Sequence, residues 1–200
     1  MSTAQVSVSA APDTRERVLD IAERLVQRRG YNGFSYADIA GELDITKAAL
    51  HYHFAGKAEL GEALIERYST RFATALETID ATAEEATAKL DAYAGLYADV
   101  LRGDRMCLCG MLAAEYETLP APMSGAVLRF FDFNTAWLAR VLADGSSAGT
   151  LSFEATPADA ARGLLGALQG AMLVARPYGD PKVFRAVTAT ALSALTAPAS

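Results

Sequence analysis

The chain has 200 residues, enough for one large domain or two small ones, and 52% of them are hydrophobic. No apolar run is long enough to span a bilayer, and two cysteines are too few for a fold held by disulfides, so we expect a cytoplasmic protein with no membrane partner. The net charge of −6 is uneven, because residues 1–71 hold nine Lys and Arg against ten Asp and Glu, whereas residues 72–200 hold nine against fourteen. A nearly neutral N-terminal part can still carry a basic face.

The first helix is predicted to follow a short leader. Residues 1–12 are small and polar and predict a disordered segment. After it, Asp13 and Glu16 resemble a capping box, and Gly30 suits the end of a helix over residues 13–29. The apolar side chains of this helix fall on one stripe. They are Val18, Ile21, Ala22, Leu25 and Val26.

Two short helices and one long helix are predicted next. Ser35 with Asp38 begins a helix through Leu43, and Thr46 caps a third helix that ends near His53. After the break at Ala55 and Gly56, apolar residues in steps of four predict a long connecting helix over residues 57–79. The first three helices, residues 13–56, therefore form a compact unit with a tight turn between the second and third.

The remaining chain, residues 57–200, is predicted to be a larger helical bundle. Proline and glycine punctuate it, and β-branched strand formers are sparse. We expect helices over 86–101, 107–117, 123–143, 157–175 and 181–195. The predicted fold class is therefore all-α, with an N-terminal three-helix helix-turn-helix domain joined by a long helix to a helical-bundle domain for ligand binding and dimerisation.

The only two histidines, His51 and His53, lie in the third helix. Residues two apart on a helix are separated by about 200°, so these side chains face opposite ways. A helical zinc site places its ligands four residues apart, and a catalytic pair also requires side chains that meet. We therefore expect no metal, no cofactor and no catalytic residue. The absence of a nucleophile–base pair or a phosphate loop likewise predicts that the chain is not an enzyme.

A different role fits the third helix, which displays small and polar groups beside an apolar side. Ala49, Leu50 and Phe54 can face inward, while the opposite face fits a DNA major groove. A lysine donates to guanine, alanine contacts a thymine methyl, and tyrosine or histidine donates to phosphate. The alternatives are a merely solvated face and, for one histidine, packing at the helix end. The predicted DNA-binding residues are Ser35, Thr46, Lys47, Ala48, His51, Tyr52, His53 and Lys57.

Four segments, in order, resemble the DNA-binding domain of TetR-family transcriptional regulators. They are residues 14–25 (TRERVLDIAERL), 29–31 (RGY), 38–40 (DIA) and 46–60 (TKAALHYHFAGKAEL). The resemblance implies a two-domain all-α homodimer, usually a repressor that leaves its operator when a small molecule enters the C-terminal domain. One position departs from the family, which most often has an aromatic residue, usually Tyr, where this chain has His51. We therefore expect a different operator sequence.

The later helices carry a few polar and aromatic side chains on otherwise apolar faces, which is typical of small-molecule cavities. Ordinary core packing is the alternative for each of them. The residues predicted to bind an effector are Tyr93, Tyr97, Cys107, Met111, Phe130, Asn134, Trp137, Gln169 and Met172.

Cys107 offers a second possible sensing chemistry. A cysteine at a helix start, near Arg105 and backbone amides, can have a lowered pKa and react as a thiolate. The segment also resembles a subgroup of the family in which a cysteine opens this helix, and some members of that subgroup sense electrophiles or oxidants. Cys109 departs from the subgroup, which usually has a hydrophobic residue there. An inert buried cysteine is the alternative.

The last two helices, 157–175 and 181–195, are rich in small residues that allow close helix packing, and we expect them to form a homodimer interface. The predicted interface stripe consists of Leu164, Leu168, Phe184, Val187 and Leu195. The sequence thus predicts a dimeric repressor released from a palindromic operator by a small molecule. Three alternatives remain: a redox-sensing repressor acting through Cys107, a helical receptor that does not act on DNA, and a monomer.

Overall fold

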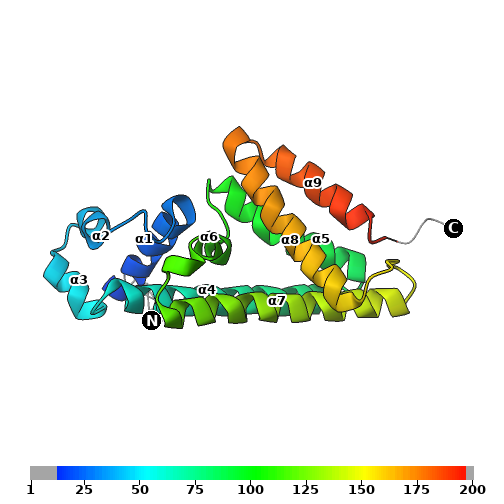
Figure 1. Cartoon of the computed structure of the whole chain (residues 1–200), viewed down its shortest axis with the longest axis horizontal. Helices are drawn as coiled ribbons and strands as arrows, with labels where there is room; N and C mark the ends of the chain where they lie inside the picture. The colour runs from blue at the N-terminus through cyan, green and yellow to red at the C-terminus, as the bar shows by residue number, and fades with distance from the viewer. Residues whose placement is uncertain (1–12, 197–200) are drawn as a thin grey trace, which may run out of the picture.

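The computed structural model describes residues 13–196, so the predicted leader at residues 1–12 lies outside the described residues. Its order of elements confirms the all-α prediction (Figure 1). The helices are α1 (Thr14–Arg29), α2 (Tyr36–Leu43), α3 (Lys47–His53), α4 (Lys57–Thr82), α5 (Ala86–Arg102), α6 (Leu108–Ala114), α7 (Ala121–Ser147), α8 (Pro157–Ala175) and α9 (Pro181–Ser193), with short 3-10 helices η1 (Tyr116–Thr118) and η2 (Arg176–Tyr178).

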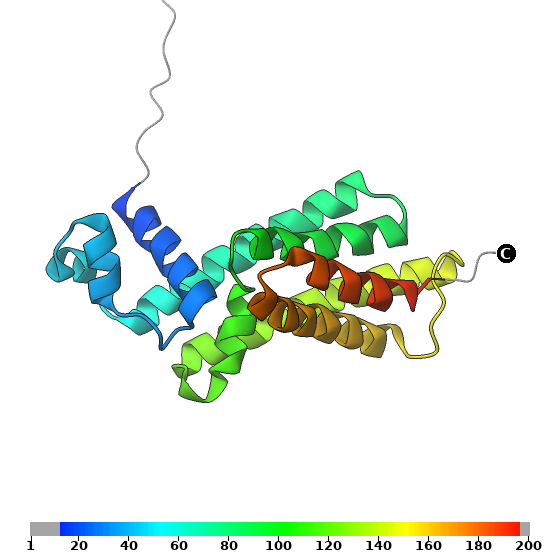
Figure 2. The same ribbon diagram turned by 90° about the horizontal axis from the view of Figure 1, so that it is seen from above.

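The helices form a small unit and a larger bundle. Helices α1, α2 and α3 gather at one end of the molecule, and α4 leads from them into the bundle beside α7 (Figures 1 and 2). Helices α8 and α9 pack on each other, and α7 packs on α4, α5 and α8. Between residues 13 and 196, no helix has both the length and the apolar character needed to cross a bilayer.

Four of the five residues in the predicted apolar stripe of α1 are buried, with Val18 and Leu25 at 0% and 2% exposure, and Ile21 is half-buried against the core. The predicted capping box at its start is wrong, because the side chain of Asp13 makes no capping hydrogen bond. The carboxylate of Glu16 instead accepts from Arg67 of α4 at 3.1 Å. A partner distant in the sequence has therefore replaced the local one.

Several predicted helix ends differ from the structure. The helix predicted over 123–143 extends at both ends to Ala121–Ser147, the one over 86–101 ends at Arg102, and the one over 181–195 ends at Ser193. The connecting helix continues to Thr82, three residues beyond the predicted end, because no glycine or proline interrupts it and the Ala83 amide still donates to Ile79. The predicted helix over 107–117 is shorter, because Cys107 is its N-cap and Glu115 leaves helical geometry before η1 begins.

Gly145 is one of the glycines that follow the predicted end of the helix over 123–143, but it lies inside α7. A Cβ atom at this position would lie 2.5 Å from Cδ1 of Leu151 and 2.7 Å from Cβ of Ala86. The glycine therefore allows α7, the start of α5 and the segment after α7 to approach closely.

Gly145→Ala is expected to lower the free energy of unfolding by about 1–3 kcal/mol, because the added methyl overpacks this contact. Gly95→Ala is the matched control, since no atom lies within 4 Å of its Cβ position. The control is expected to stabilise α5 by about 0.5–1 kcal/mol. Chemical denaturation measures both values, and equal effects of the two substitutions would contradict the packing argument.

Candidate nucleic-acid interface and effector site

Helix α3 is held in place from its apolar side. The side chains of Leu50 and Phe54 are 0% and 1% exposed. At the start of the helix, Oγ1 of Thr46 accepts a hydrogen bond from the Ala49 amide at 3.1 Å. At its end, the Tyr36 hydroxyl of α2 donates to the Phe54 carbonyl at 3.1 Å. These contacts fix the angle between α2 and α3, and hence the direction in which the opposite face points.

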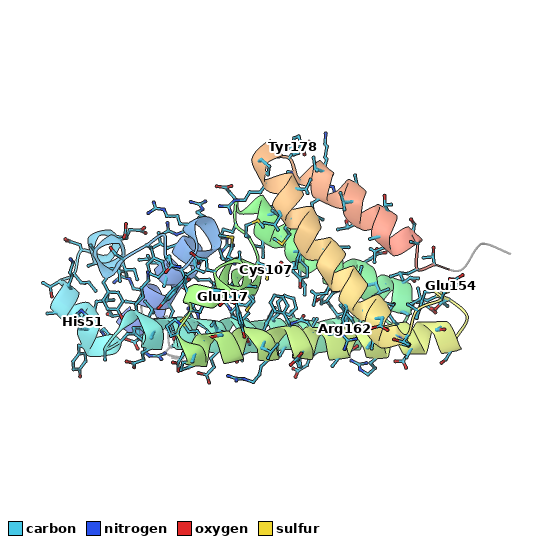
Figure 3. All side chains as sticks on the ribbon, viewed as in Figure 1. His51, Cys107, Glu117, Glu154, Arg162 and Tyr178 are labelled. Atoms are coloured by element: carbon cyan, nitrogen blue, oxygen red, sulfur yellow. The ribbon has the colours of Figure 1, made fainter. Side chains whose placement is uncertain are left out.

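That opposite face is open to solvent, as predicted. Lys47, Ala48 and His51 are exposed, and Tyr52 is exposed to 87% (Figure 3 labels His51). Nδ1 of His51 lies 3.0 Å from the Ala55 carbonyl, which fixes Nδ1 as a donor and leaves Nε2 for another molecule. In the described part of the chain, no three His, Cys, Asp or Glu side chains gather as a metal site.

Two of the predicted DNA-binding residues have other contacts. The Ser35 hydroxyl donates to the Asp38 carboxylate at 2.7 Å, so its proton is used within the turn before α2. His53 is half-buried, and its ring meets the Tyr52 ring edge-on at 5.5 Å. The predicted phosphate contacts of these residues would require them to exchange or share these partners.

Lys57 differs more clearly from its predicted role as a phosphate ligand. Its ammonium donates to the carbonyls of Tyr31 and Phe34. It also lies 4.5 and 4.2 Å from the centroids of their two rings. Burial lowers the pKa of this ammonium. Lys57 therefore joins the start of α4 to the α1–α2 turn, and its predicted phosphate contact, which stays a prediction, would require it to give up these partners.

The residues predicted to bind an effector lie in the bundle interior, and five of them form one network. The hydroxyls of Tyr97 and Tyr93 lie 3.0 Å apart. The Tyr93 hydroxyl donates a hydrogen bond to Oδ1 of Asn134 at 3.0 Å. Nδ2 of Asn134 donates to the Phe130 carbonyl at 2.8 Å, and Trp137 stacks on Tyr93 at 5.4 Å. Burial raises the pKa values of both tyrosines, so their hydroxyls stay protonated donors.

The other four predicted residues lie beside this network. Sγ of the buried Cys107 is 3.7 Å from the Tyr68 hydroxyl of α4, at the centre of the molecule (Figure 3). Met172 is buried and Met111 is half-buried. Nε2 of Gln169 is buried, and within residues 13–196 it has no hydrogen-bond partner. An unpaired buried donor of this kind favours a ligand that supplies an acceptor.

A groove of about 720 Å³ lies outside this core, between α4 and α7. Glu62, Glu66 and Arg129 are among its charged residues, and Phe130 is the one predicted effector-binding residue that lines it. Phe130 thus separates the groove from the interior network.

Two parts of the chain match known family patterns. Residues 18–64 match the family described as bacterial regulatory proteins, tetR family, and residues 86–191 match the tetracyclin repressor-like C-terminal domain. The chain belongs to the TetR family. A chain in which an N-terminal segment and the C-terminal domain both match regulators is a DNA-binding transcriptional regulator and not an enzyme.

Solved structures of TetR-family regulators share the whole architecture. One from Agrobacterium tumefaciens is 31% identical, with a TM-score of 0.88 over 92% of this chain and 97% of that one. One from Legionella pneumophila is 30% identical, with a TM-score of 0.82 over 94% and 100%. The match to the regulator TtgR of Pseudomonas putida is 39% identical over 56 residues, which cover 28% of this chain and only 27% of TtgR. The sequence similarity to TtgR is thus confined to a segment of about the length of the DNA-binding domain.

Sequence reasoning missed a carboxylate that joins the two domains of this TetR-family chain. Glu115, after α6, accepts hydrogen bonds from the Tyr31 amide at 2.5 Å and the Asn32 amide at 3.1 Å. Both amides belong to the turn between α1 and α2. No local pattern marks Glu115, because its partners lie more than 80 positions away in the sequence.

A second missed contact is a charge cluster between α1 and α4. Arg67 contacts Asp20 at 2.8 Å and Glu23 at 3.0 Å, and Arg71 also contacts Glu23. Glu23 is only 7% exposed, so its paired charge is costly to separate. These ion pairs therefore join α1 to α4.

Asp80 near the end of α4 is a third missed residue. Its carboxylate accepts from Trp137 Nε1 and Lys89 at 3.0 Å each, and from Arg140 at 2.6 Å. Burial raises the pKa of Asp80, but the hydrogen bonds from Arg140, Lys89 and Trp137 outweigh burial and lower it to about 2.

This lowered pKa predicts a pH-dependent stability. The charged form of Asp80 stabilises the fold above the unfolded-state pKa of about 4, and this contribution is lost as the pH falls through about 2. The difference in unfolding free energy between the wild type and Asp80→Asn is therefore expected to shrink between pH 4 and pH 2. Denaturant titrations at several pH values measure it, and a difference that stays constant would contradict the assignment.

Proposed function

We propose that this chain is a homodimeric repressor that binds a palindromic operator through α3 and leaves it when a small molecule enters the bundle. The exposed face of α3 carries this proposal. Lys47, Ala48, His51 and Tyr52 share that face, while Leu50 and Phe54 anchor the opposite side. A short helix that offers donors and one small side chain in this way suits base edges and phosphates of a major groove.

The dimer surface is proposed on α8 and α9, and it keeps Val187 of the stripe that the sequence indicated. Leu164, Leu168 and Phe184 are buried within the chain's own core and cannot meet a second copy. The exposed apolar side chains of these helices and of η2 are Leu173, Val174, Val187 and Tyr178. The Cβ positions of three glycines on α8 also face open space, namely Gly163, Gly166 and Gly170. A face of small and apolar groups supports close packing of two copies.

The proposed response to the effector is a population shift that α4 transmits. Phe72 of α4 packs edge-on against Phe130 at 5.2 Å and Tyr93 at 6.0 Å, so a molecule inserted among these rings favours a different position of α4. Arg67, on the same helix, forms ion pairs with Asp20 and Glu23 of α1, so a shift of α4 also displaces α1. The two reading helices of the dimer then no longer match successive major grooves.

A gel shift with the DNA upstream of the chain's own coding sequence tests operator binding. A retarded band that disappears with unlabelled specific DNA, but persists with unrelated DNA, is the expected result. A thermal-shift screen of metabolites and drugs then finds effectors. The effector proposal predicts that a stabilising compound releases the operator, and that Asn134→Leu reduces the response to it.

A cysteine-based response is a second candidate, favoured by the contact between Cys107 and Tyr68 of the connecting helix. Because Cys107 is 1% exposed, a reagent reaches it only when α6 moves. If this candidate is right, Cys107→Ser is expected to abolish operator release by diamide or a quinone, and Cys109→Ser is the matched control. Unchanged release in Cys107→Ser would eliminate the candidate.

A further inference from the structure

A cleft of about 400 Å³ lies between the turn after α5 and the turn between α8 and α9. Tyr178 marks the second turn at the top of the molecule in Figure 3. None of the nine residues predicted to bind an effector lines the cleft, although Arg176 of the cleft contacts Sδ of Met111 at 3.6 Å. Arg102, Arg105 and Arg176 contribute guanidinium groups to it, and Leu101, Ala175 and Pro181 contribute apolar surface.

Two of these arginines have only neutral partners among the described residues. Arg105 is half-buried, and its guanidinium donates to the side-chain carbonyl of Gln27 at 3.3 Å. Arg176 is exposed, and its guanidinium donates to the backbone carbonyl of Arg28 and contacts Sδ of Met111 at 3.6 Å. Within residues 13–196, neither guanidinium has a carboxylate within 4.0 Å. A half-buried guanidinium without a counter-charge favours an anion that can accept two hydrogen bonds.

The acidic groups around the cleft are already engaged or lie at its edge. Asp99 pairs with Arg102. Asp104 is 86% exposed at its side chain and lies 3.8 Å from Arg28. Asp180 caps α9 by accepting from the Lys182 amide at 2.8 Å. The cleft therefore keeps an excess of positive charge at Arg105 and Arg176.

We propose that this cleft binds a small organic phosphate monoester, with the phosphate between Arg105 and Arg176 and the organic part against Leu101 and Pro181. The volume of the cleft exceeds that of a phosphate ion, and its apolar lining suits a short carbon skeleton. The planar fork of each arginine matches the geometry of phosphate oxygens.

Binding at this site also affects the DNA-binding domain, because both arginines donate hydrogen bonds to residues near the end of α1. Gln27 is 1% exposed, so drawing Arg105 away leaves a buried carbonyl without its partner. Occupancy of the cleft thus weakens the attachment of α1 to the bundle. This second consequence rests on the proposed operator binding, whereas anion binding itself does not.

Isothermal titration calorimetry of the full chain with phenyl phosphate tests the site, and phenol is the neutral matched probe. Phenyl phosphate is expected to bind about tenfold more tightly than phenol or inorganic phosphate. Arg105→Gln is expected to weaken its binding about tenfold, whereas Arg129→Gln, at an exposed arginine of α7, leaves it unchanged. Asp104→Asn is expected to tighten binding about threefold by removing a nearby negative charge.

Several outcomes would overturn the proposal: no heat of binding with phenyl phosphate, equal affinity for phenol or inorganic phosphate, or equal weakening by Arg105→Gln and Arg129→Gln. Arg176→Gln replaces Arg105→Gln if the latter does not melt cooperatively. Fluorescence anisotropy with operator DNA, at constant ionic strength, adds the second readout. Phenyl phosphate is expected to lower the operator affinity of the wild type about threefold, and that of Arg105→Gln not at all. Failure of the wild type to bind any operator would contradict the proposed function, and calorimetry would still decide the site.

Discussion

Replacing Lys47 and Tyr52 together with alanine is expected to lower operator affinity about a hundredfold or more, because each base or phosphate contact contributes about 1–3 kcal/mol and a dimer loses both copies. The two side chains are exposed, so the stability of the chain is expected to stay unchanged. Fluorescence anisotropy at several salt concentrations measures the loss.

The salt dependence distinguishes the two kinds of contact. If Lys47 contacts phosphate, Lys47→Ala reduces the slope of log affinity against log salt by about one per contact. If it reads a guanine, the slope changes little and sequence preference relaxes instead. Tyr116→Ala, at an exposed tyrosine outside α3, is the matched control for Tyr52→Ala. An equal loss in Tyr116→Ala would show that α3 does not form the interface.

Glu115→Ala is expected to lower the free energy of unfolding by about 1–3 kcal/mol, because the amides of Tyr31 and Asn32 lose a charged acceptor. For a chain of this length, each kcal/mol lowers Tm by about 2–4 °C. The same substitution frees the α1–α2 turn from α6. An effector is therefore expected to change the operator affinity of the variant less than that of the wild type. Thermal unfolding and operator titrations with and without effector measure these changes.

Glu117→Ala is the control for this substitution, since Glu117 is an exposed carboxylate two residues further along (Figure 3). It is expected to change the free energy of unfolding by no more than about 0.5 kcal/mol, as most surface substitutions do. If both variants lose stability equally, general charge and not the hydrogen bonds to the turn would explain the result. A stable Glu115→Ala chain with an unchanged effector response would contradict a coupling role.

The sequence predicted elements well where the determining signals are local. The apolar spacing in α1, the Thr46 cap and the prolines at the starts of α8 and α9 each act within a few residues. The exposed face of α3 follows from the same periodicity, because burying Leu50 and Phe54 turns Lys47 and Tyr52 outward. Periodicity also identified Tyr93, Phe130 and Asn134 as sharing one interior, since they lie on the inner faces of α5 and α7.

Periodicity reports which face of a helix is apolar, but not what covers it. Leu164, Leu168 and Phe184 carry the same pattern whether they meet a second copy or the chain's own core, and the structure places them in the core. Gly145 similarly looked like a helix break, whereas the approach of Leu151 and Ala86 explains it.

The amino-acid sequence by itself thus determined the helices and the exposed face of α3, because these depend on contacts within one or two helical turns, and its motifs identified the family. Only the tertiary structure decided the partners of Lys57, Glu115 and Arg105, which lie 26, 84 and 78 positions away along the chain. A charged side chain looks the same in the sequence whether it meets water, DNA or another helix. Its partner is fixed by the packing of distant segments, which sets which polar groups lie within hydrogen-bond distance.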